Sequence, residues 1–204
     1  MFITIEGGEG GGKSTNMAFI QQYLESANQS VVVTREPGGT ALGEKIRDIL
    51  LDPDHKGMDA SAELLLMFAA RAQHIEKIIR PALAQGQWVL CDRFTDATFA
   101  YQGGGRGIDM QRIAALENWV QGDLRPDITL LFDLPVNVGM ERAGKRAKLD
   151  RFEREKREFF ERIRACYLSM AVAEPKRYSV LNAEKSLTEV QNELRIILDK
   201  VLEK

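Results

Sequence analysis

Short runs of apolar, mostly β-branched residues alternate along the chain with longer stretches whose apolar positions recur at helical spacing. The runs are "FITI", "VVVT", "WVLC", "ITLLF" and "YSVL", at residues 2–5, 31–34, 88–91, 128–132 and 178–181. Runs with so little polar alternation are typical of strands in a parallel sheet that helices cover on both faces. Their alternation with helices predicts an α/β doubly wound fold with five strands. Ligands in such folds bind at the carboxyl ends of the strands.

Two of the predicted helices have distinctive patterns. The last one, from Leu187 to Leu202, has its apolar residues in one stripe, which predicts packing of that stripe on the sheet. The segment Ser61–Ile79 is instead apolar on nearly every side at residues 64–68. Either this helix packs on the sheet and also against a second subunit, or it is a central helix buried within one chain. We expect the first arrangement, a homodimer, and keep the second open.

Composition and charge narrow the class of protein. The 204 residues, 44% hydrophobic and 28% charged, fit one globular domain spanning residues 1–204. A net charge of −2 argues against nucleic acid or a membrane surface as a general partner. Cys91 and Cys166 form no CxxC pair, which argues against a disulfide framework and a zinc site. No signal-peptide pattern is visible, so we expect a cytoplasmic location.

A glycine-rich loop is the strongest chemical signal. "GGEGGGKS", Gly7–Ser14, matches G-x-x-x-x-G-K-[ST] between a predicted strand and a predicted helix. Its backbone N–H groups are expected to hold the phosphates of a nucleotide, with Lys13 bridging the β- and γ-phosphates and Ser14 ligating Mg²⁺, as in an ATPase, a GTPase or a kinase. A flexible turn is the alternative. The residues expected at ATP are Gly7, Gly8, Glu9, Gly10, Gly11, Gly12, Lys13, Ser14 and Thr15.

Polar clusters follow three of the predicted strands. "REPGGT" follows the second, "DRF" follows the third, and Asp133 follows the fourth. Asp92 has the position of an acid that holds Mg²⁺ directly or through water, and Arg93 offers a fork suited to phosphate. A surface ion pair is the alternative for these two residues, and Asp133 fits a plain surface position equally well. The N-K-x-D tetrapeptide of a guanine reader is absent from the sequence, so a GTP switch is not expected.

Taken in order, the loop, "TREPGGT", "LLLMFAARAQH", "DRF", "AYQGGGRGID" and "LDRFERE" resemble the thymidylate kinase family. The pattern is most similar to its bacterial kind, which has no arginine in the phosphate loop. The resemblance implies a P-loop nucleoside-monophosphate kinase fold, with a five-stranded parallel sheet, helices on both faces and a short mobile lid. It also implies Mg²⁺-dependent transfer of the γ-phosphoryl group of ATP to dTMP in dTTP biosynthesis. Another P-loop nucleotide or deoxynucleoside kinase, or a nucleotide-dependent regulatory ATPase, remains the alternative.

The resemblance also places residues at the acceptor. Phe68 matches the aromatic residue that stacks on thymine, Arg93 the arginine that clamps the dTMP phosphate, and Glu9 the carboxylate at the 3′-hydroxyl. Considered without the family, Phe68 fits an ordinary core position. The residues expected at dTMP are Glu9, Arg35, Glu36, Pro37, Phe68, Arg71, Arg93, Thr98, Tyr101 and Gln102.

A basic segment at residues 141–157 is the predicted lid. Eight of its seventeen residues are Lys or Arg, and a solvated helix with internal ion pairs is the alternative. Phosphoryl transfer benefits from an arginine at the transition state, and the phosphate loop contains none. The expected catalytic residues are therefore Lys13, Arg93, Arg146 and Arg151, with the two lid arginines unranked.

The adenine of ATP is the last expected contact. Arg142 resembles the family arginine that lies on this base. Asn182 and Ala183, in "LNAEKS", are weaker candidates for the same pocket.

Overall fold

The computed structural model describes residues 1–55, 57–144 and 150–203. Five parallel strands form a sheet in the order β2-β3-β1-β4-β5. The strands are β1 (Phe2–Glu6), β2 (Val31–Arg35), β3 (Trp88–Asp92), β4 (Ile128–Asp133) and β5 (Tyr178–Asn182). The predicted α/β fold and all five predicted strands are confirmed.

Each strand runs one residue beyond its apolar run, at the carboxyl end. The added residues are all polar: Glu6, Arg35, Asp92, Asp133 and Asn182. The pairing is in register there, since Arg35 lies opposite Asp92 and Asp133 opposite Asn182. Because both faces of the sheet are covered by helices, polar side chains are accommodated at the strand ends, and they gather at one edge.

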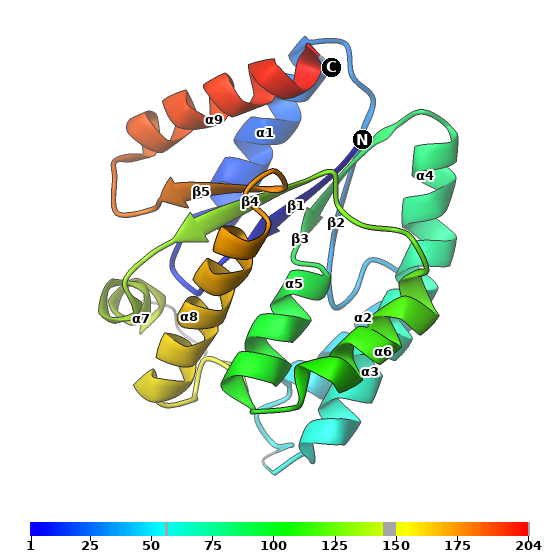
Figure 1. The fold of residues 1–204 in the computed structure, drawn as a ribbon, viewed down its shortest axis with the longest axis vertical. Coiled ribbons are helices and arrows are strands. Elements are labelled where there is room, and N and C mark those ends of the chain that lie inside the picture. Colours follow the sequence, from blue (N-terminus) through cyan, green and yellow to red (C-terminus); the bar gives the residue numbers. More distant parts are fainter. Residues whose placement is uncertain (56, 145–149, 204) are drawn as a thin grey trace.

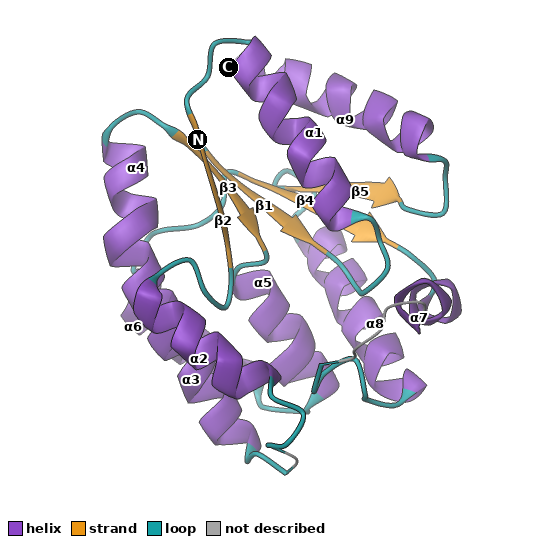
Figure 2. Cartoon of the chain, turned by 180° about the vertical axis from the view of Figure 1, so that it is seen from behind, coloured by secondary structure: helices purple, strands orange, loops and turns teal. Residues whose placement is uncertain are grey.

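Helices cover both faces of the sheet, with α1 and α9 on one side and α5 and α8 on the other (Figures 1 and 2). The segments are α1 (Lys13–Ser26), α2 (Ala41–Leu51), α3 (Ala60–His74), η1 (Ile75–Ile79), α4 (Arg80–Ala84), α5 (Thr95–Thr98), η2 (Phe99–Gly105), α6 (Met110–Gln121), α7 (Val136–Gly144), α8 (Arg157–Ala173) and α9 (Leu187–Leu202).

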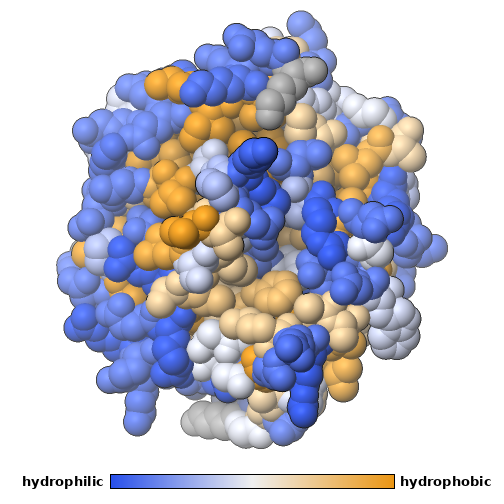
Figure 3. All heavy atoms as spheres, viewed as in Figure 1, coloured by the Kyte–Doolittle hydropathy of each residue, from blue (hydrophilic) through white to orange (hydrophobic). Residues whose placement is uncertain are grey.

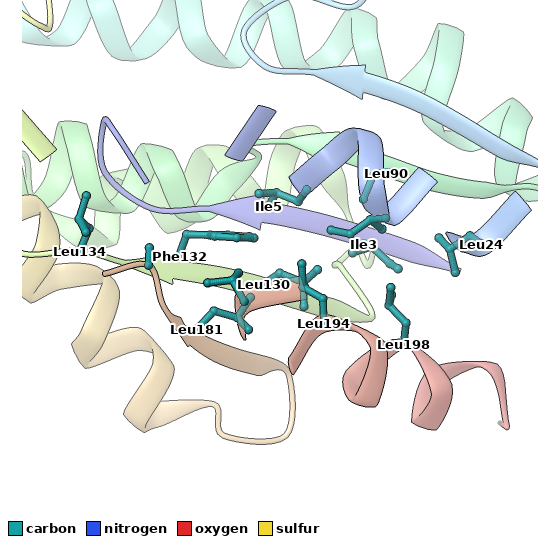
Figure 4. Packing of buried hydrophobic residues seen from close by; sticks show 13 residues of the cluster. Ile3, Ile5, Leu24, Leu90, Leu130, Phe132, Leu134, Leu181, Leu194 and Leu198 are labelled. Atoms are coloured by element: carbon teal, nitrogen blue, oxygen red, sulfur yellow. The ribbon is translucent and has the colours of Figure 1, made fainter. Parts of the chain in front are cut away.

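The largest apolar cluster lies between the sheet and the α1–α9 layer (Figure 4). Leu194 and Leu198 of α9 and Leu24 of α1 pack there against strand residues such as Ile3 and Leu130. The predicted stripe on α9 is thus confirmed. A capping box in which Ser186 and Glu189 bond to each other's backbone fixes the start of this helix.

The segment predicted as one helix over Ser61–Ile79 changes geometry at its end. It forms α3 and then the π-helical turn η1, where the Arg80 N–H reaches the Ile75 carbonyl. Pro81 follows at once; it lacks an N–H, and its ring would crowd an α-helical turn before it. The wider turn buries Ile75 and Ile79 beneath Phe2 and Val89.

No helix among the described residues is both long enough and apolar enough to cross a membrane. In Figure 3, blue hydrophilic atoms cover much of the outline of the visible face, with smaller orange areas between them.

We predict that Leu194→Ala lowers the free energy of unfolding by about 2–5 kcal/mol, because it leaves a cavity in the core beneath the sheet. Ile196, on the same helix, is 57% exposed, and Ile196→Ala is the matched control, expected within about 0.5 kcal/mol of the parent chain. Urea unfolding of the three proteins measures both values. Equal losses in the two variants would contradict the assignment of α9's buried face.

Candidate active site

The phosphate loop joins β1 to α1 and ends in a tight turn. Gly12 has a φ of 76° and precedes Lys13, the first residue of α1. The Lys13 ammonium donates to the carbonyls of Gly7 at 3.1 Å and Gly8 at 2.6 Å. Burial, followed by the charge of Arg93, lowers the pKa of Lys13. The lysine is thus held along the loop by its own backbone.

Two contacts require glycine in this loop. At Gly7, with a φ of +129°, a Cβ atom would lie 2.4 Å from the Phe132 carbonyl oxygen. At Gly10, with a φ of +75°, it would lie 2.6 Å from the carbonyl oxygen of Gly139 in α7. The loop backbone therefore lies directly against β4 and α7, with no side chain between.

A cavity of about 380 Å³ opens at the carboxyl edge of the sheet. The loop forms one side, and the residues after β2 and β3 form another. Sixteen of the predicted site residues line it, and these are Glu9, Gly10, Gly11, Gly12, Lys13, Ser14, Thr15, Arg35, Glu36, Pro37, Arg71, Asp92, Arg93, Thr98, Tyr101 and Gln102. The structure thus brings most of the expected donor and acceptor residues to one cavity.

Arg93 and Glu9 meet where the loop borders the cavity. Arg93 Nη2 donates to Glu9 Oε1 at 2.5 Å, and Nη1 donates to the Gly7 carbonyl at 2.9 Å. The guanidinium lies 4.9 Å from the ring centroid of Tyr101, whose hydroxyl donates to the same Glu9 oxygen at 3.2 Å. Arg93 has a φ of 65°, a left-handed conformation that is uncommon outside glycine. These contacts fix the side chain at the cavity wall.

Glu36 organises a second arginine. Its Oε2 accepts from Arg71 Nε at 2.7 Å, and its Oε1 lies 2.8 Å from His74 Nδ1. Arg71 Nη2 donates to Thr98 Oγ1 at 2.9 Å and to the Phe94 carbonyl at 3.2 Å. Arg71 Nη1 is buried with no hydrogen-bond partner among the described residues. This cavity-lining arginine thus keeps one donor for a ligand.

The structure places Phe68 differently from its neighbour Met67. The Phe68 ring is buried with Leu64 and Ile113, and it lies 4.8 Å from the Arg71 guanidinium. Met67 lines the cavity, whereas Phe68 does not. Spacing does not separate the two, because Met67 and Phe68 lie four and three residues from Arg71, and both spacings bring side chains to one face of a helix.

The sequence analysis also missed other parts of the wall. Arg47 and Leu51 contribute from α2, and Arg47 donates to the Pro37 carbonyl at 2.8 Å. The remaining unpredicted lining residues are Phe94, Ala97, Asp150, Phe152 and Glu153. Phe94 lies in "DRF", and Asp150, Phe152 and Glu153 lie in "LDRFERE" within the predicted lid, whereas Arg47, Leu51 and Ala97 belong to no motif.

Ser14 and Asp92 are the expected Mg²⁺ ligands, and their chemistry fits. Both line the cavity, Ser14 is exposed, and Asp92 Oδ1 is buried without a hydrogen-bond partner in residues 1–55, 57–144 and 150–203. No cluster of three or more potential ligands occurs in the part of the chain that the structure describes. Mg²⁺ commonly binds one or two protein oxygens and completes its shell with phosphate and water, so two ligands suffice.

Some predicted site residues lie elsewhere. Gly7 and Gly8 border a second cavity of about 240 Å³, between the loop, β4, α7 and α8. Asp133 also lines that cavity, where it forms a two-point ion pair with Arg164 at 2.7 and 2.9 Å. Arg142 donates to the Ala183 carbonyl at 3.0 Å, which joins two of the candidates for the adenine pocket.

Of the two predicted lid arginines, the structure describes only Arg151. Arg146 lies outside the described residues. Arg151 is buried, does not line the cavity, and lies 2.6 Å from Glu63. Nothing in its described contacts leads toward the phosphate loop.

Glu6 is a buried acid that was not predicted from the sequence, because it directly follows an apolar run. Its oxygens accept from the Phe94 N–H at 2.7 Å and from the Tyr167 hydroxyl at 2.7 Å. Burial, with a further contribution from Asp96, raises the pKa of Glu6 to about 8. This carboxyl group lies directly before the loop and supports the residue after Arg93.

The comparisons with known proteins identify the family. A family model described as thymidylate kinase matches residues 5–194. The chain belongs to the thymidylate kinase family. It is 59% identical over 203 residues to a thymidylate kinase of Pseudomonas syringae pv. tomato, covering 100% of this chain and 97% of the relative. It is 58% identical over 200 residues to that of Alcanivorax borkumensis, covering 98% and 96%.

A solved structure of the family has the same fold. The crystal structure of thymidylate kinase from Ehrlichia chaffeensis superposes with a TM-score of 0.79 and 37% identity, covering 98% of both chains. This chain is therefore a dTMP kinase, which uses ATP to phosphorylate dTMP to dTDP. The alternatives of another substrate or of a regulatory ATPase are set aside.

We predict that Glu6→Gln flattens the pH dependence of stability. The folded chain keeps a proton on Glu6 up to about pH 8, whereas the group ordinarily loses it near 4.5. Between these values the folded state binds more protons than the unfolded state, so this group makes the free energy of unfolding fall as pH rises. Glutamine has no proton to lose there. Urea unfolding from pH 5 to 8 measures the slope.

The control for this prediction is Glu25→Gln, at an exposed position of α1, which should keep the parent slope. Identical slopes for Glu6→Gln and the parent chain would show that Glu6 does not titrate in this range.

Proposed function

We propose that the cavity of about 380 Å³ is where the γ-phosphoryl group of ATP meets the phosphate of dTMP, within one catalytic domain. The observation that supports this most is the contact between Glu9 of the donor loop and Arg93 of the acceptor side. This contact joins the donor side of the site to the acceptor side. We also propose that the protein is located in the cytoplasm, where ATP is supplied.

On the donor side, loop N–H groups bind the phosphates of ATP and Lys13 bridges the β- and γ-phosphates. Ser14 and Asp92 hold Mg²⁺, which when bound neutralises charge on the phosphate oxygens. Arg142 lies on adenine beside Ala183, which fits its hydrogen bond to that carbonyl. Lys13 and Arg142 are held by hydrogen bonds to backbone carbonyls, which limits their rearrangement during the reaction.

On the acceptor side, Arg93 clamps the dTMP phosphate through its planar fork. Glu9 accepts a hydrogen bond from the 3′-hydroxyl. Arg71 turns its unpaired Nη1 to the base or phosphate. Met67 lines the cavity with an apolar side chain. We therefore assign to Met67 the contact with the base that was first expected of Phe68. The remaining acceptor contacts come from Arg35, Glu36, Pro37, Thr98, Tyr101 and Gln102.

The reaction needs positioning and charge stabilisation more than proton transfer. The oxygen that attacks belongs to a phosphate and is already anionic, so no strong base is required. The charge of the transition state spreads over the equatorial oxygens. The loop has no arginine, as in the bacterial kind of the family. Arg146 is therefore our remaining lid candidate for that role.

Exposed apolar side chains on α2, α3 and α6 support the proposed homodimer. Leu65 on α3 is 56% exposed and Trp119 on α6 is 81% exposed. Leu42 and Ile49 on α2 and Met110 on α6 are exposed as well. The three helices pack together at one end of the molecule (Figures 1 and 2). A second copy that covers this face would bury the all-round apolar pattern of α3.

We predict that Glu9→Ala raises the KM for dTMP about tenfold or more and changes the KM for ATP about twofold or less. The carboxylate loses a charge-assisted hydrogen bond to the acceptor sugar, worth about 1.5–3 kcal/mol. Steady-state assays of ADP release, varying each substrate in turn, measure the two constants. An equal rise in both would place Glu9 in general support of the loop.

We predict that Leu65→Glu converts the dimer to a monomer, because it places a charge within the covered apolar face. Ile196→Glu, at 57% exposure on α9, is the matched control and should leave the assembly unchanged. Sedimentation velocity of both variants and the parent chain gives the oligomeric state. A monomeric parent chain, or a dimeric Leu65→Glu variant, would overturn this interface.

A further inference from the structure

A fully buried carboxylate that does not line the cavity, that of Glu63, lies in the first turn of α3. Gln102 Nε2 donates to its Oε1 at 2.8 Å. Arg106 donates to Oε1 and Oε2, each at 3.3 Å, and Arg151 Nη2 lies 2.6 Å from Oε2. A buried charge is stable only where such partners compensate the loss of water. Glu63 is thus the centre of a defined polar cluster.

The partners of Glu63 belong to two segments of the cavity wall. Gln102, in η2, lines the cavity itself. Arg151 directly precedes Phe152, which also lines the cavity. Arg106 spans the two segments, because it donates to Glu155 at 2.5 Å and lies 5.6 Å from the ring centroid of Phe152. One carboxylate therefore ties together parts of the wall that are far apart in sequence.

The described contacts of Arg151 all hold this wall in place. Its N–H donates to the Leu51 carbonyl at 3.1 Å, and its Nε donates to the Leu50 carbonyl at 2.8 Å. Its guanidinium lies 4.5 Å from the ring centroid of Phe152. These bonds attach the segment to the end of α2, and together with Glu63 they use the arginine as a structural cation.

The charges in the cluster balance. Two guanidinium groups, of Arg106 and Arg151, face two carboxylates, of Glu63 and Glu155. Loss of Glu63 would leave buried positive charge without compensation. The segment after the cluster would then move to reach water, and Phe152 and Gln102 would move with it.

We propose that Glu63 is a positioning residue for the dTMP site, which acts through Gln102 and through the Arg151–Phe152 wall. Arg151 is in this view an anchor for that wall and does not contact the transferred phosphoryl group. The inference rests on the proposed role of the cavity as the acceptor site. It predicts that disturbing Glu63 affects dTMP and leaves the ATP side nearly unchanged.

The test compares three variants with the parent chain in ADP-release assays. Glu63→Gln keeps the shape of the side chain and removes its charge, Glu63→Asp keeps the charge and shortens the reach, and Arg151→Gln removes the anchor. Each should raise the KM for dTMP, by about tenfold for the glutamine variants and less for Glu63→Asp. The KM for ATP should stay within about twofold. The double variant Glu63→Gln/Arg151→Gln should lose less than the product of the two single effects, because the pair is removed together.

Glu117→Gln is the matched control, since Glu117 pairs with Arg125 at 3.0 Å, is little exposed, and does not line the cavity. It should leave both KM values unchanged. If the Glu63 variants lower only the melting temperature, or raise both KM values equally, Glu63 is structural and the proposal fails. An Arg151→Gln variant that loses kcat at saturating substrates, with both KM values unchanged, would return Arg151 to the reacting phosphates. Failure of the parent chain to saturate with dTMP would instead overturn the proposed function.

Discussion

Burial of the parallel sheet on both faces is the constraint on which the site depends. Helices cover both faces of the sheet, so the interiors of the strands are mostly apolar, with a hydrogen-bonded pair of hydroxyls at Thr4 and Thr129 as an exception. Charged and amide side chains occur where a strand emerges from this cover, and all five strands end in one. The chemistry therefore collects at a single edge, where the phosphate loop, Asp92 and Arg93 meet.

A second regularity is that an acid accompanies each of several functional arginines. Glu9 holds Arg93, Glu36 holds Arg71, and Glu63 holds Arg151. A carboxylate presents two oxygens to the guanidinium fork, much as a phosphate does. The acids at the cavity keep the arginines oriented before a substrate arrives, which reduces the entropy lost on binding. This pairing explains how the phosphate loop can contain a carboxylate, that of Glu9, although the loop binds anions.

Much of the fold was predictable because its signals are local. Apolar runs located the strands, the glycine pattern located the loop, and strand ends located Asp92 and Arg93. The orientation of side chains was not predictable. Met67 and Phe68 are adjacent and both apolar, and only packing against Ile113 decides which one reaches the cavity. Glu63 was missed for another reason. Its partners lie 39 to 88 residues away along the sequence, and no local pattern indicates a polar cluster of such long range.

The contact between Gly10 and Gly139 restricts which residues the phosphate loop can contain. Two backbones touch there, and any L side chain at residue 10 would run into α7. An arginine at that point is excluded by space and by backbone conformation, whatever its charge could do for a phosphate. At Gly8, by contrast, a Cβ atom would meet nothing within 4 Å. The packing of one helix against the loop thus limits the positions from which a cation could be added by single substitution.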